Sequence, residues 1–377
     1  MEKKFDLAIV GAGIMGMGCA LEAARVGMRV VIFDPTPLSE KASWAAAGIL
    51  VTRDAQTFLS PFREFYVRSI HLYPQWLREI SILSGMTVSL NHGGDFQVYD
   101  LSYPKSAQHY QAKLKQLDRE HSRNFTIEDR LPPFLSKHSP LQNVKALHFP
   151  AETYVQNREL LTALSQACEN VGVHRICGEP NLDFKVTNGK TRIQFAEGEL
   201  ETHKLILTAG TWTGKILENL GLSAPMIPVK GQMIRIQKFY AENCMVHFNE
   251  DLYLVPRGDS LIVGATTEAG VWQEGFDERG ETYLRQHLER LLPAIAREPM
   301  EEWSGLRPRT RDRLPWMGWI DSERGWAICT GHYKCGISMA PLAAQSMTKL
   351  IRGEKPQIDL EPFNPWRRQG LSRLSLV

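Results

Sequence analysis

The stretch Leu7-Ala8-Ile9-Val10-Gly11-Ala12-Gly13-Ile14-Met15-Gly16, close to the amino terminus, decides the fold. Its apolar run leads directly into Gly-x-Gly-x-x-Gly, and small residues continue to Gly27, which predicts a strand, a tight turn and a helix. A second apolar run follows and ends in Asp34, 23 positions after Gly11. A strand, a glycine turn, a helix, a strand and an acid in this order predict a dinucleotide-binding unit rather than an ordinary glycine-rich turn.

Each residue of this fingerprint has its own physical task. Gly11 makes the tight turn, and Gly13 lets the backbone approach a pyrophosphate at the positive end of the helix. Gly16 lets the helix lie close to the strands, and Asp34 accepts hydrogen bonds from a ribose. The residues of this unit that we expect to contact the cofactor are Gly11, Gly13, Ile14, Met15, Gly16 and Asp34.

The position of the fingerprint favours FAD over NAD. The chain has one such fingerprint, at its amino terminus, so nothing indicates a second nucleotide site for a pyridine coenzyme. A chain of 377 residues that begins with its nucleotide turn has room to wrap a long, extended ligand.

Bulk properties exclude several classes of protein. The length predicts two domains, which can be interleaved. The 44 basic and 42 acidic residues give a net charge of +2, so we expect no nucleic-acid partner. No apolar run approaches the roughly 18 to 20 residues that span a bilayer. The six cysteines form no CxxC pair, which indicates a reducing cytoplasm, no disulfide framework and no zinc site or other bound metal.

The periodicity of apolar residues predicts an α/β fold, α+β overall. Helices are expected over residues 61–84, 106–121, 157–171 and 276–297, the first of them kinked or split at Pro74. Strands alternate with helices up to about residue 210, whereas residues 228–266 have the pattern of an antiparallel sheet. This alternation predicts two domains that each recur along the chain.

Two arginine-containing segments are expected at the surface. Arg309, Arg311 and Arg313 are interpreted as a solvated loop. The tail from Pro365 to Val377 is interpreted as a frayed terminus rather than a membrane-surface anchor.

Taken together, these motifs resemble the FAD-dependent amino-acid oxidases of the D-amino-acid oxidase group, and most closely the bacterial glycine oxidases. The resemblance covers nearly the whole chain, and it is specific because short motifs recur in the same order and spacing. Besides the amino-terminal fingerprint, they are Ser43 to Leu50, Thr208 to Gly210, Pro228 to Gln232, Tyr253 to Arg257, Gly264 to Thr266, Gly305 to Pro308 and Gly331 to Pro341.

The fold that the resemblance implies is a Rossmann-like FAD-binding domain built from three chain segments, with an interleaved substrate domain that contains an antiparallel sheet. We assign residues 1–85, 145–222 and 308–365 to the FAD-binding domain and residues 86–144 and 223–307 to the substrate domain. Residues 366–377 form the tail.

The resemblance also implies a substrate site. Arg307 matches the arginine that pairs with the substrate carboxylate, and Tyr253 matches the tyrosine whose hydroxyl contacts the same group. The alternatives are a surface ion pair for Arg307 and a plain core role for Tyr253. Ile49 would line the pocket. Lys334 stands where glycine oxidases commonly have arginine, so it keeps the positive charge without the guanidinium fork.

Four further segments are expected to bind the cofactor. The loop with Ser43, Ala46, Ala47 and Gly48 would lie against the flavin, Asn181 would contact the adenine through its backbone, and Ala209 and Gly210 would form a second wall. The turn that would face the pyrimidine ring contains Gly331, His332, Tyr333, Cys335, Gly336 and Ile337. We expect Cys335 to pack rather than act as a reactive thiol.

Two positions favour non-covalent FAD and the glycine-oxidase side of the group. In monomeric sarcosine oxidase, a relative, a cysteine attaches the flavin and a lysine activates oxygen. Gly305 and Ile262 occupy the matching positions in this chain.

The expected reaction is oxidative deamination of glycine, sarcosine or a small D-amino acid to the imino or 2-oxo acid, with reduction of oxygen to hydrogen peroxide. One alternative is a D-amino-acid or proline dehydrogenase that passes electrons to a quinone. Another is a non-catalytic flavin-binding subunit of a complex. The expected partners are a small amino acid and oxygen, with no integral membrane segment. A homo-oligomer and a place in thiamine biosynthesis stay open.

Overall fold

A mixed eight-stranded sheet grows from the predicted βαβ unit. The computed structural model describes residues 4–53, 55, 58–120, 124–178, 182–187, 189–237, 242–249, 252–298, 300–368 and 370–373. β1 (Lys4–Val10), α1 (Ile14–Arg25) and β2 (Val30–Asp34) follow in the predicted order. β1 pairs in parallel with β2 and with β12 (Gly198–Leu207), β2 with β9 (His174–Cys177), and β12 with β21 (Trp326–Thr330).

The strands of this sheet come from three separated parts of the chain. The antiparallel strands β10 (Asp183–Thr187), β11 (Lys190–Phe195) and β20 (Trp316–Asp321) complete it. This agrees with the alternation of segments in the sequence, while the domain bounds themselves stay a prediction.

Successive residues of a strand point to opposite faces of the sheet, and in these strands both sets are apolar. Both faces are therefore covered by helices or other elements. Leu7 and Ile9 belong to the core under the helices, and Ala8 and Val10 to the core on the other face. The helices over the first face are α1, α3 (Ser60–His71), α4 (Tyr73–Ser84), α7 (Asn157–Asn170) and α10 (Gly336–Ile351), and α8 (Thr213–Asn219) lies on the second. Pro74 lies in the first turn of α4, so the predicted long helix is split there.

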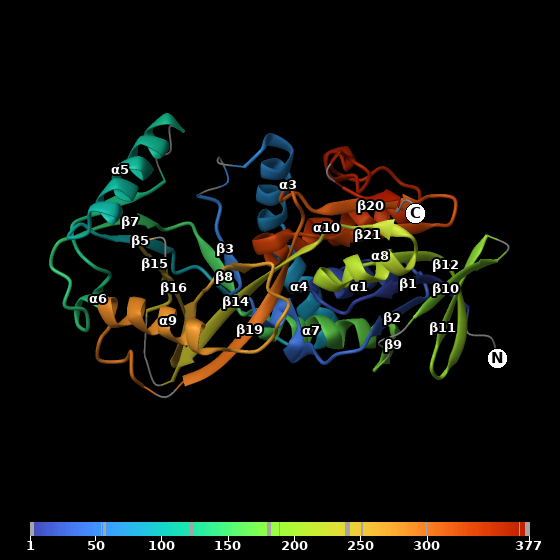
Figure 1. Ribbon diagram of the computed structural model, residues 1–377, viewed down its shortest axis with the longest axis horizontal. Coiled ribbons are helices and arrows are strands. Elements are labelled where there is room, and N and C mark those ends of the chain that lie inside the picture. The colour runs from blue at the N-terminus through green and yellow to red at the C-terminus, as the bar shows by residue number, and fades with distance from the viewer. Residues whose placement is uncertain are drawn as a thin grey trace.

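A nine-stranded, largely antiparallel sheet forms the other lobe, beside the first along the long axis of the molecule (Figure 1). α9 (Glu278–Leu291) packs three leucines on it, and α5 (Pro104–Arg119) lies on its β5 side. Its strands are β5 (Asp95–Asp100), β6 (Thr126–Glu128), β7 (Val144–Phe149), β14 (Ile227–Ile236), β15 (Met245–Phe248), β16 (Leu252–Arg257), β17 (Ser260–Gly264), β18 (Glu268–Ala269) and β19 (Met300–Arg309).

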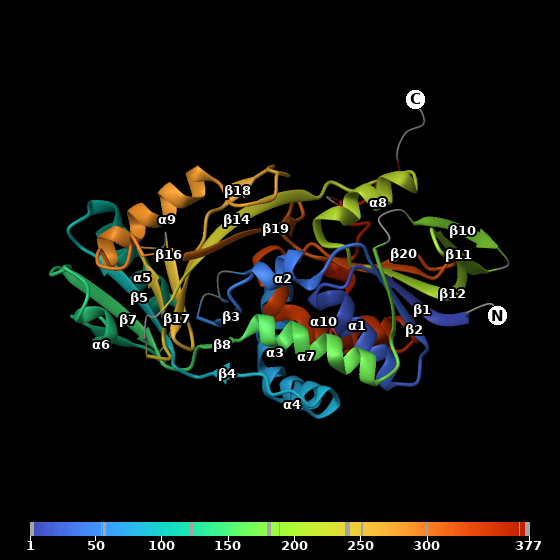
Figure 2. The same ribbon diagram turned by 90° about the horizontal axis from the view of Figure 1, so that it is seen from below.

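The long pair β14 and β19 connects the two lobes. Its register runs from Ile227 opposite Arg309 to Ile236 opposite Met300. Figure 2 shows the two strands passing from the second sheet towards the helices of the first. The smaller elements are β3 (Ile49–Leu50), β4 (Leu90–Asn91), β8 (Thr153–Val155), β13 (Leu222–Ser223), β22 (Ser372–Arg373), α2 (Ala42–Ala45), α6 (Pro133–Ser136) and four 3₁₀ turns at residues 38–40, 210–212, 333–335 and 361–363.

The prediction of a frayed tail is wrong as far as Arg373. The Arg367 guanidinium contacts Asp312 at 2.7 Å between Nε and Oδ2, and the Trp366 indole donates to the carbonyl of Ile320 at 2.9 Å. Leu371 is buried, and β22 pairs with β13. The tail therefore packs on the first lobe through contacts that its own sequence could not reveal.

The solvated loop predicted around residue 310 is also partly wrong. Arg309 ends β19, pairs with Ile227, and lies 5.9 Å from the ring centre of Tyr333. Arg311 and Arg313 are exposed, as predicted. Across the described ranges, no helix combines the length and the apolar character that crossing a bilayer requires.

Candidate cofactor and substrate site

One large cavity opens where the parallel strands end and reaches the second sheet. Its volume is about 1590 Å³, larger than the about 300–1,000 Å³ of pockets for drug-sized ligands. Residues at the carboxyl ends of β1, β2, β12 and β21 line it, among them Gly11, Pro35, Thr208 and Thr330. Ligands of open α/β sheets bind at this edge. The cavity therefore has room for an extended dinucleotide and a small second molecule.

The glycine turn forms a cradle at the start of α1. Gly11 has φ +107°, and a Cβ there would lie 2.8 Å from the backbone of Ala209. A Cβ on Gly16 would lie 1.8 Å from the Gly11 carbonyl oxygen, so only glycine lets helix and turn meet. A Cβ on Gly13 would meet only the Ser43 hydroxyl, at 3.5 Å. Gly11 and Gly16 are therefore required by packing, whereas Gly13 keeps space open for a ligand.

Asp34 is buried at the end of β2. One carboxylate oxygen accepts from the N–H of Ala12, and the other accepts from the N–H of Thr36 at 3.0 Å and pairs with Lys41. The acid thus lies on the cavity wall beside the glycine turn, as the ribose prediction requires. Asn181, the predicted adenine contact, lies outside the described residues.

The loop from Ser43 to Gly48 is held from outside the cavity by three side chains that we did not predict. The Asn157 amide donates to the carbonyls of Ser43 and Trp44 at 2.9 and 3.0 Å. The Trp303 indole donates to Ala45 at 3.0 Å, and the Arg257 guanidinium donates to Ala47. In a trans peptide the next N–H points away from the carbonyl. The N–H of Gly48 therefore points away from Arg257, and Gly48 itself lines the cavity.

Arg257 is enclosed by neutral groups. Its guanidinium lies 3.2 Å from the Asn157 amide oxygen and 5.3 Å from the centre of the Tyr154 ring. Burial lowers the pKa of Arg257 to about 10. The cationic side chain of Arg257 therefore holds the loop from the side that faces away from the cavity.

The turn before α10 supplies the opposite wall. His332 is buried, burial lowers its pKa to about 3, and its Nε2 has no hydrogen-bond partner among the described residues. An orphaned buried nitrogen costs free energy unless a ligand satisfies it. Burial also raises the pKa of the Cys335 thiol to about 12, so it is no thiolate, in agreement with the predicted packing role.

The glycine cradle and the orphaned nitrogen together fit the FAD expected from the sequence. Gly305 lines the cavity, and a Cβ on it would lie 2.6 Å from the Cβ of Ala45. A cysteine for flavin attachment has no space there. Ile262 is buried in an apolar cluster with Met233 and Val255.

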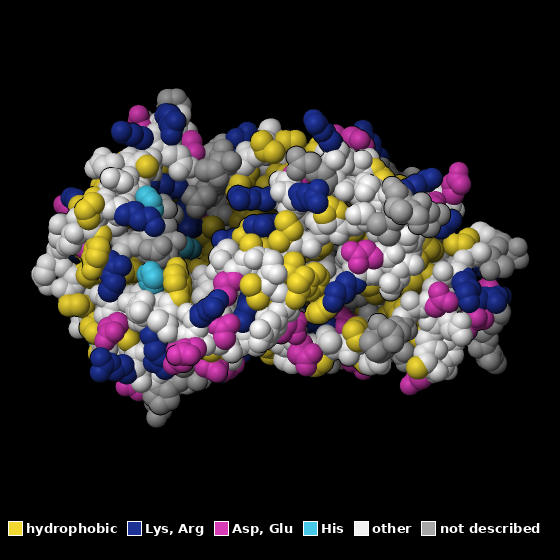
Figure 3. Space-filling view, in the orientation of Figure 1, with side chains coloured by type: hydrophobic (Ala, Val, Ile, Leu, Met, Phe, Trp, Pro, Cys, Tyr) yellow, Lys and Arg dark blue, Asp and Glu magenta, His cyan; other side chains and the backbone are white. Residues whose placement is uncertain are grey.

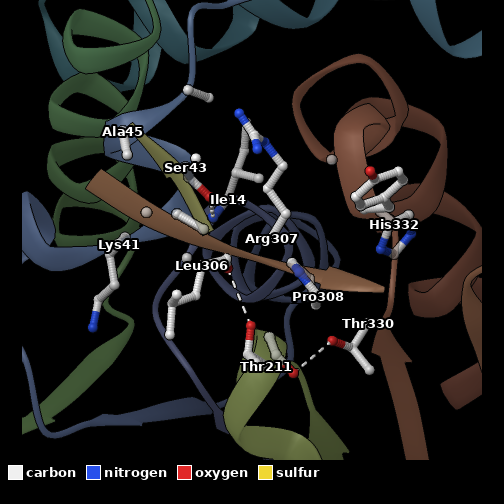
Figure 4. A pocket seen from close by; sticks show the side chains of 18 of the residues that line it. Ile14, Lys41, Ser43, Ala45, Thr211, Leu306, Arg307, Pro308, Thr330 and His332 are labelled. Atoms are coloured by element: carbon white, nitrogen blue, oxygen red, sulfur yellow. Dashed lines mark hydrogen bonds between the residues drawn. The ribbon is translucent and has the colours of Figure 1, made fainter. Parts of the chain in front are cut away.

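Arg307 stands on β19 in the open part of the cavity. Figure 4 shows it rising between Ser43 on one side and His332 on the other. Its guanidinium covers Gly231 of β14, where a Cβ would lie 2.2 Å from two of its nitrogens. Nη1 donates to the carbonyl of Thr266 at 3.1 Å. Within the described ranges Arg307 forms no ion pair, which disfavours the alternative of a surface ion pair.

The other predicted substrate residues surround Arg307. The Tyr253 hydroxyl donates to the Met233 sulfur at 2.9 Å, and burial raises its pKa. Ile49 and Lys334 line the same cavity. Burial of the ammonium and the nearby Arg307 charge lower the pKa of Lys334.

A charged cluster that we did not predict lies on the second-sheet side. The His247 imidazole contacts Asp95 at 2.7 Å through Nδ1, and Arg53 contacts the other oxygen of Asp95 at 3.2 Å. Arg53 and His247 line the cavity. Sequence reasoning missed the cluster because Arg53 and His247 come from loop and strand segments about two hundred positions apart.

Most of the predicted site residues line this cavity. Two do not line it: Gly16 packs behind the turn, and Gly331, with φ +81°, packs against Thr310. Gly16 thus has the close packing that was predicted for it, and the cofactor contacts of both glycines stay predictions. Those that line the cavity are Gly11, Gly13, Ile14, Met15, Asp34, Ser43, Ala46, Ala47, Gly48, Ile49, Ala209, Gly210, Tyr253, Arg307, His332, Tyr333, Lys334, Cys335, Gly336 and Ile337.

Comparisons with known proteins agree with this geometry. The family model described as FAD dependent oxidoreductase matches residues 6–350. The chain is 25% identical to a glycine oxidase of Bacillus licheniformis, covering 99% of this chain and 100% of the relative. It is 27% identical to a glycine oxidase of Pseudomonas aeruginosa, covering 95% and 98%. The crystal structure of glycine oxidase from Geobacillus kaustophilus superposes with a TM-score of 0.87 at 24% identity, covering 98% and 100%.

Proposed function

The chain belongs to the FAD dependent oxidoreductase family, and on this premise we propose that it oxidises glycine, sarcosine or a small D-amino acid with oxygen as the electron acceptor. FAD is its cofactor, and its reaction is the FAD-dependent oxidation of an amino acid. The observation that carries the finer proposal is Arg307. Its guanidinium shares one cavity with the glycine cradle and forms no ion pair within the described ranges.

When bound, FAD accepts a hydride equivalent from the α-carbon of the substrate and transfers the electrons to oxygen. The Arg307 fork binds the substrate carboxylate in two parallel hydrogen bonds, which fixes orientation as well as position. Tyr253 stays protonated at neutral pH because burial raises its pKa. Its hydroxyl donates to the Met233 sulfur, a weak acceptor, and turns to the substrate carboxylate when the substrate binds.

Positioning is the contribution of the protein in this proposal. A carboxylate fixed at Arg307 limits where the α-carbon can lie, and a bound reactant with fixed orientation reacts far faster than a free one. Ile49 and Tyr253 line the same cavity as the Arg307 guanidinium. No nucleophile and no catalytic histidine is required.

A paired assay tests the proposal. The purified holoenzyme is supplied with glycine, sarcosine or D-alanine while oxygen consumption and peroxide are followed together. We expect one peroxide for each oxygen consumed. Rapid reduction of an artificial dye with negligible oxygen consumption would contradict the oxidase and favour the dehydrogenase. Absence of any amine-dependent turnover would contradict both.

Gly305 supports non-covalent FAD as part of the proposal. Because a Cβ there would lie 2.6 Å from the Cβ of Ala45, a thioether link at this position has no space. We expect acid precipitation of the holoenzyme to release all the flavin to the supernatant. Flavin that stays with the precipitate would contradict this assignment. A homo-oligomer and the cytoplasmic location stay predictions.

A further inference from the structure

Two cations on the cavity wall have no acidic partner. Arg307 and Lys334 both line the cavity, and within the described part of the chain neither forms an ion pair. Lys334 contacts the Tyr333 ring, with Nζ 5.6 Å from its centre, rather than a carboxylate. The bridge between Arg309 and His332 places β19, which carries Arg307, beside the turn that carries Lys334. Burial and the nearby Arg307 charge both lower the pKa of Lys334.

Several acids near the cavity contact groups other than Arg307 and Lys334. Glu268 accepts from Gln232 at 2.9 Å and from the Thr266 hydroxyl at 3.0 Å. Asp312 is paired with Arg367, and Asp95 with Arg53 and His247. Asp34 lies at the other end of the cavity, where it pairs with Lys41. Within the described part of the chain, none of these carboxylates forms an ion pair with Arg307 or Lys334.

More positive charge lies beside Lys334. The Arg309 guanidinium is 5.9 Å from the centre of the Tyr333 ring, which Lys334 also contacts. Figure 3 shows Lys and Arg side chains gathered around the hollow between the two lobes. A concave surface of one sign raises the local concentration of ligands of the opposite sign.

A simple amino acid makes little use of this charge. Glycine and sarcosine are zwitterions without net charge at neutral pH, and one carboxylate occupies one cation. Arg307 alone suffices for it. The ammonium group of such a substrate would also be repelled by the second cation, Lys334. An amino acid with a second acidic group has net negative charge and one carboxylate for each cation.

We infer that the substrate is an amino acid with two carboxylates, one held by Arg307 and the other by Lys334. The inference rests on the proposed function and narrows its substrate class. The redox balance is unchanged: the C–H bond beside the nitrogen breaks, two electrons reduce one oxygen, and water hydrolyses the imine to the oxo acid and the amine. The amine is unprotonated when the bond breaks, and its proton passes to water.

Steady-state kinetics on the holoenzyme test the inference with matched pairs of compounds. Iminodiacetate is compared with sarcosine, and D-aspartate with D-alanine. We expect kcat/KM to be about tenfold or more higher for the dicarboxylate of at least one pair, since one added close charge pair has that effect or a larger one. Added salt should lower this preference, because screening weakens attraction of the net-charged compound most.

Variants separate the charge from other effects. In Lys334→Met, the ratio of kcat/KM for the dicarboxylate to that for the monocarboxylate should fall by about tenfold, because KM for the dicarboxylate rises. Lys334→Arg keeps the charge and should keep most of the ratio. Lys355→Met removes the same charge from an exposed site outside the cavity and should leave the ratio unchanged. Equal kcat/KM values within both pairs, or a preference that survives Lys334→Met, would overturn the inference.

A binding measurement distinguishes this failure from failure of the proposed function. Malonate and acetate are titrated into the oxidised holoenzyme, and the change of flavin absorbance gives each Kd without turnover. Tighter malonate binding that is lost in Lys334→Met supports two carboxylate positions even if no tested amine is oxidised. Turnover of sarcosine with equal Kd values for malonate and acetate leaves the oxidase proposal standing and removes the second carboxylate.

Discussion

Replacing Arg307 by alanine should remove most of the binding free energy of the substrate carboxylate. The guanidinium lies across Gly231, donates through Nη1 to the carbonyl of Thr266, and lines the cavity. Loss of one partner of a hydrogen-bonded charge pair costs about 2–5 kcal/mol. At 1.4 kcal/mol for each factor of ten, kcat/KM should fall about 30-fold to several thousandfold.

Arg307→Lys tests the fork separately from the charge. A lysine keeps a cation but cannot form two parallel hydrogen bonds, so the kcat/KM of Arg307→Lys should lie between those of the wild type and of Arg307→Ala. The assay is steady-state oxygen consumption with the best small amino acid, and flavin absorbance confirms that each variant holds its cofactor.

Arg311→Ala is the matched control, because Arg311 is exposed and does not line the cavity. It should leave kcat/KM within about twofold, as expected of surface substitutions. If Arg307→Ala retains the wild-type kcat/KM while holding FAD, Arg307 does not bind the substrate carboxylate and the account of the site is refuted.

Three further predictions follow from the packing of the wall. Gly16→Ala should destabilise the fold by about 1–3 kcal/mol or more, because its Cβ would lie 1.8 Å from the Gly11 carbonyl oxygen. Gly13→Ala should keep the melting temperature of the apoprotein and weaken FAD binding. Equal melting temperatures of the two variants would contradict this. Asn157→Ala leaves two loop carbonyls and the Arg257 guanidinium with fewer partners, so the free energy of unfolding should fall by about 1–3 kcal/mol. An unchanged midpoint of thermal unfolding would contradict the role of Asn157 in holding the loop. The pKa of His332 is about 3 in the folded protein, below the ordinary value of 6.5, so its neutral form is favoured and its stabilisation is lost as the pH falls from 6.5 towards 3; His332→Asn should show a shallower fall of melting temperature over that range, and an unaltered slope would contradict the burial argument.

The sequence predicts those parts of the fold that depend on neighbouring residues. The glycine fingerprint, β2 with Asp34, and the break at Pro74 follow from local spacing and sterics, and all are confirmed. The positions of Arg307 and Tyr253 on one cavity wall agree with the family resemblance, while their roles stay proposals.

Contacts between distant segments could not be predicted in this way. Asn157 and Arg257 hold the Ser43–Gly48 loop from more than a hundred positions away, and Arg367 anchors the tail on Asp312. Each is a polar side chain with no local signal, and its partners become known only when the sheets bring the segments together.

The central claim, that this cavity holds FAD and presents a small amino acid to it, is tested most directly by anaerobic absorbance titration of the holoenzyme. Glycine, sarcosine, D-alanine, D-aspartate and iminodiacetate are added in turn, and air is then admitted. The account predicts that at least one of them bleaches the bound flavin, and that air restores the colour with formation of peroxide. A bound flavin that none of these amino acids bleaches would contradict it.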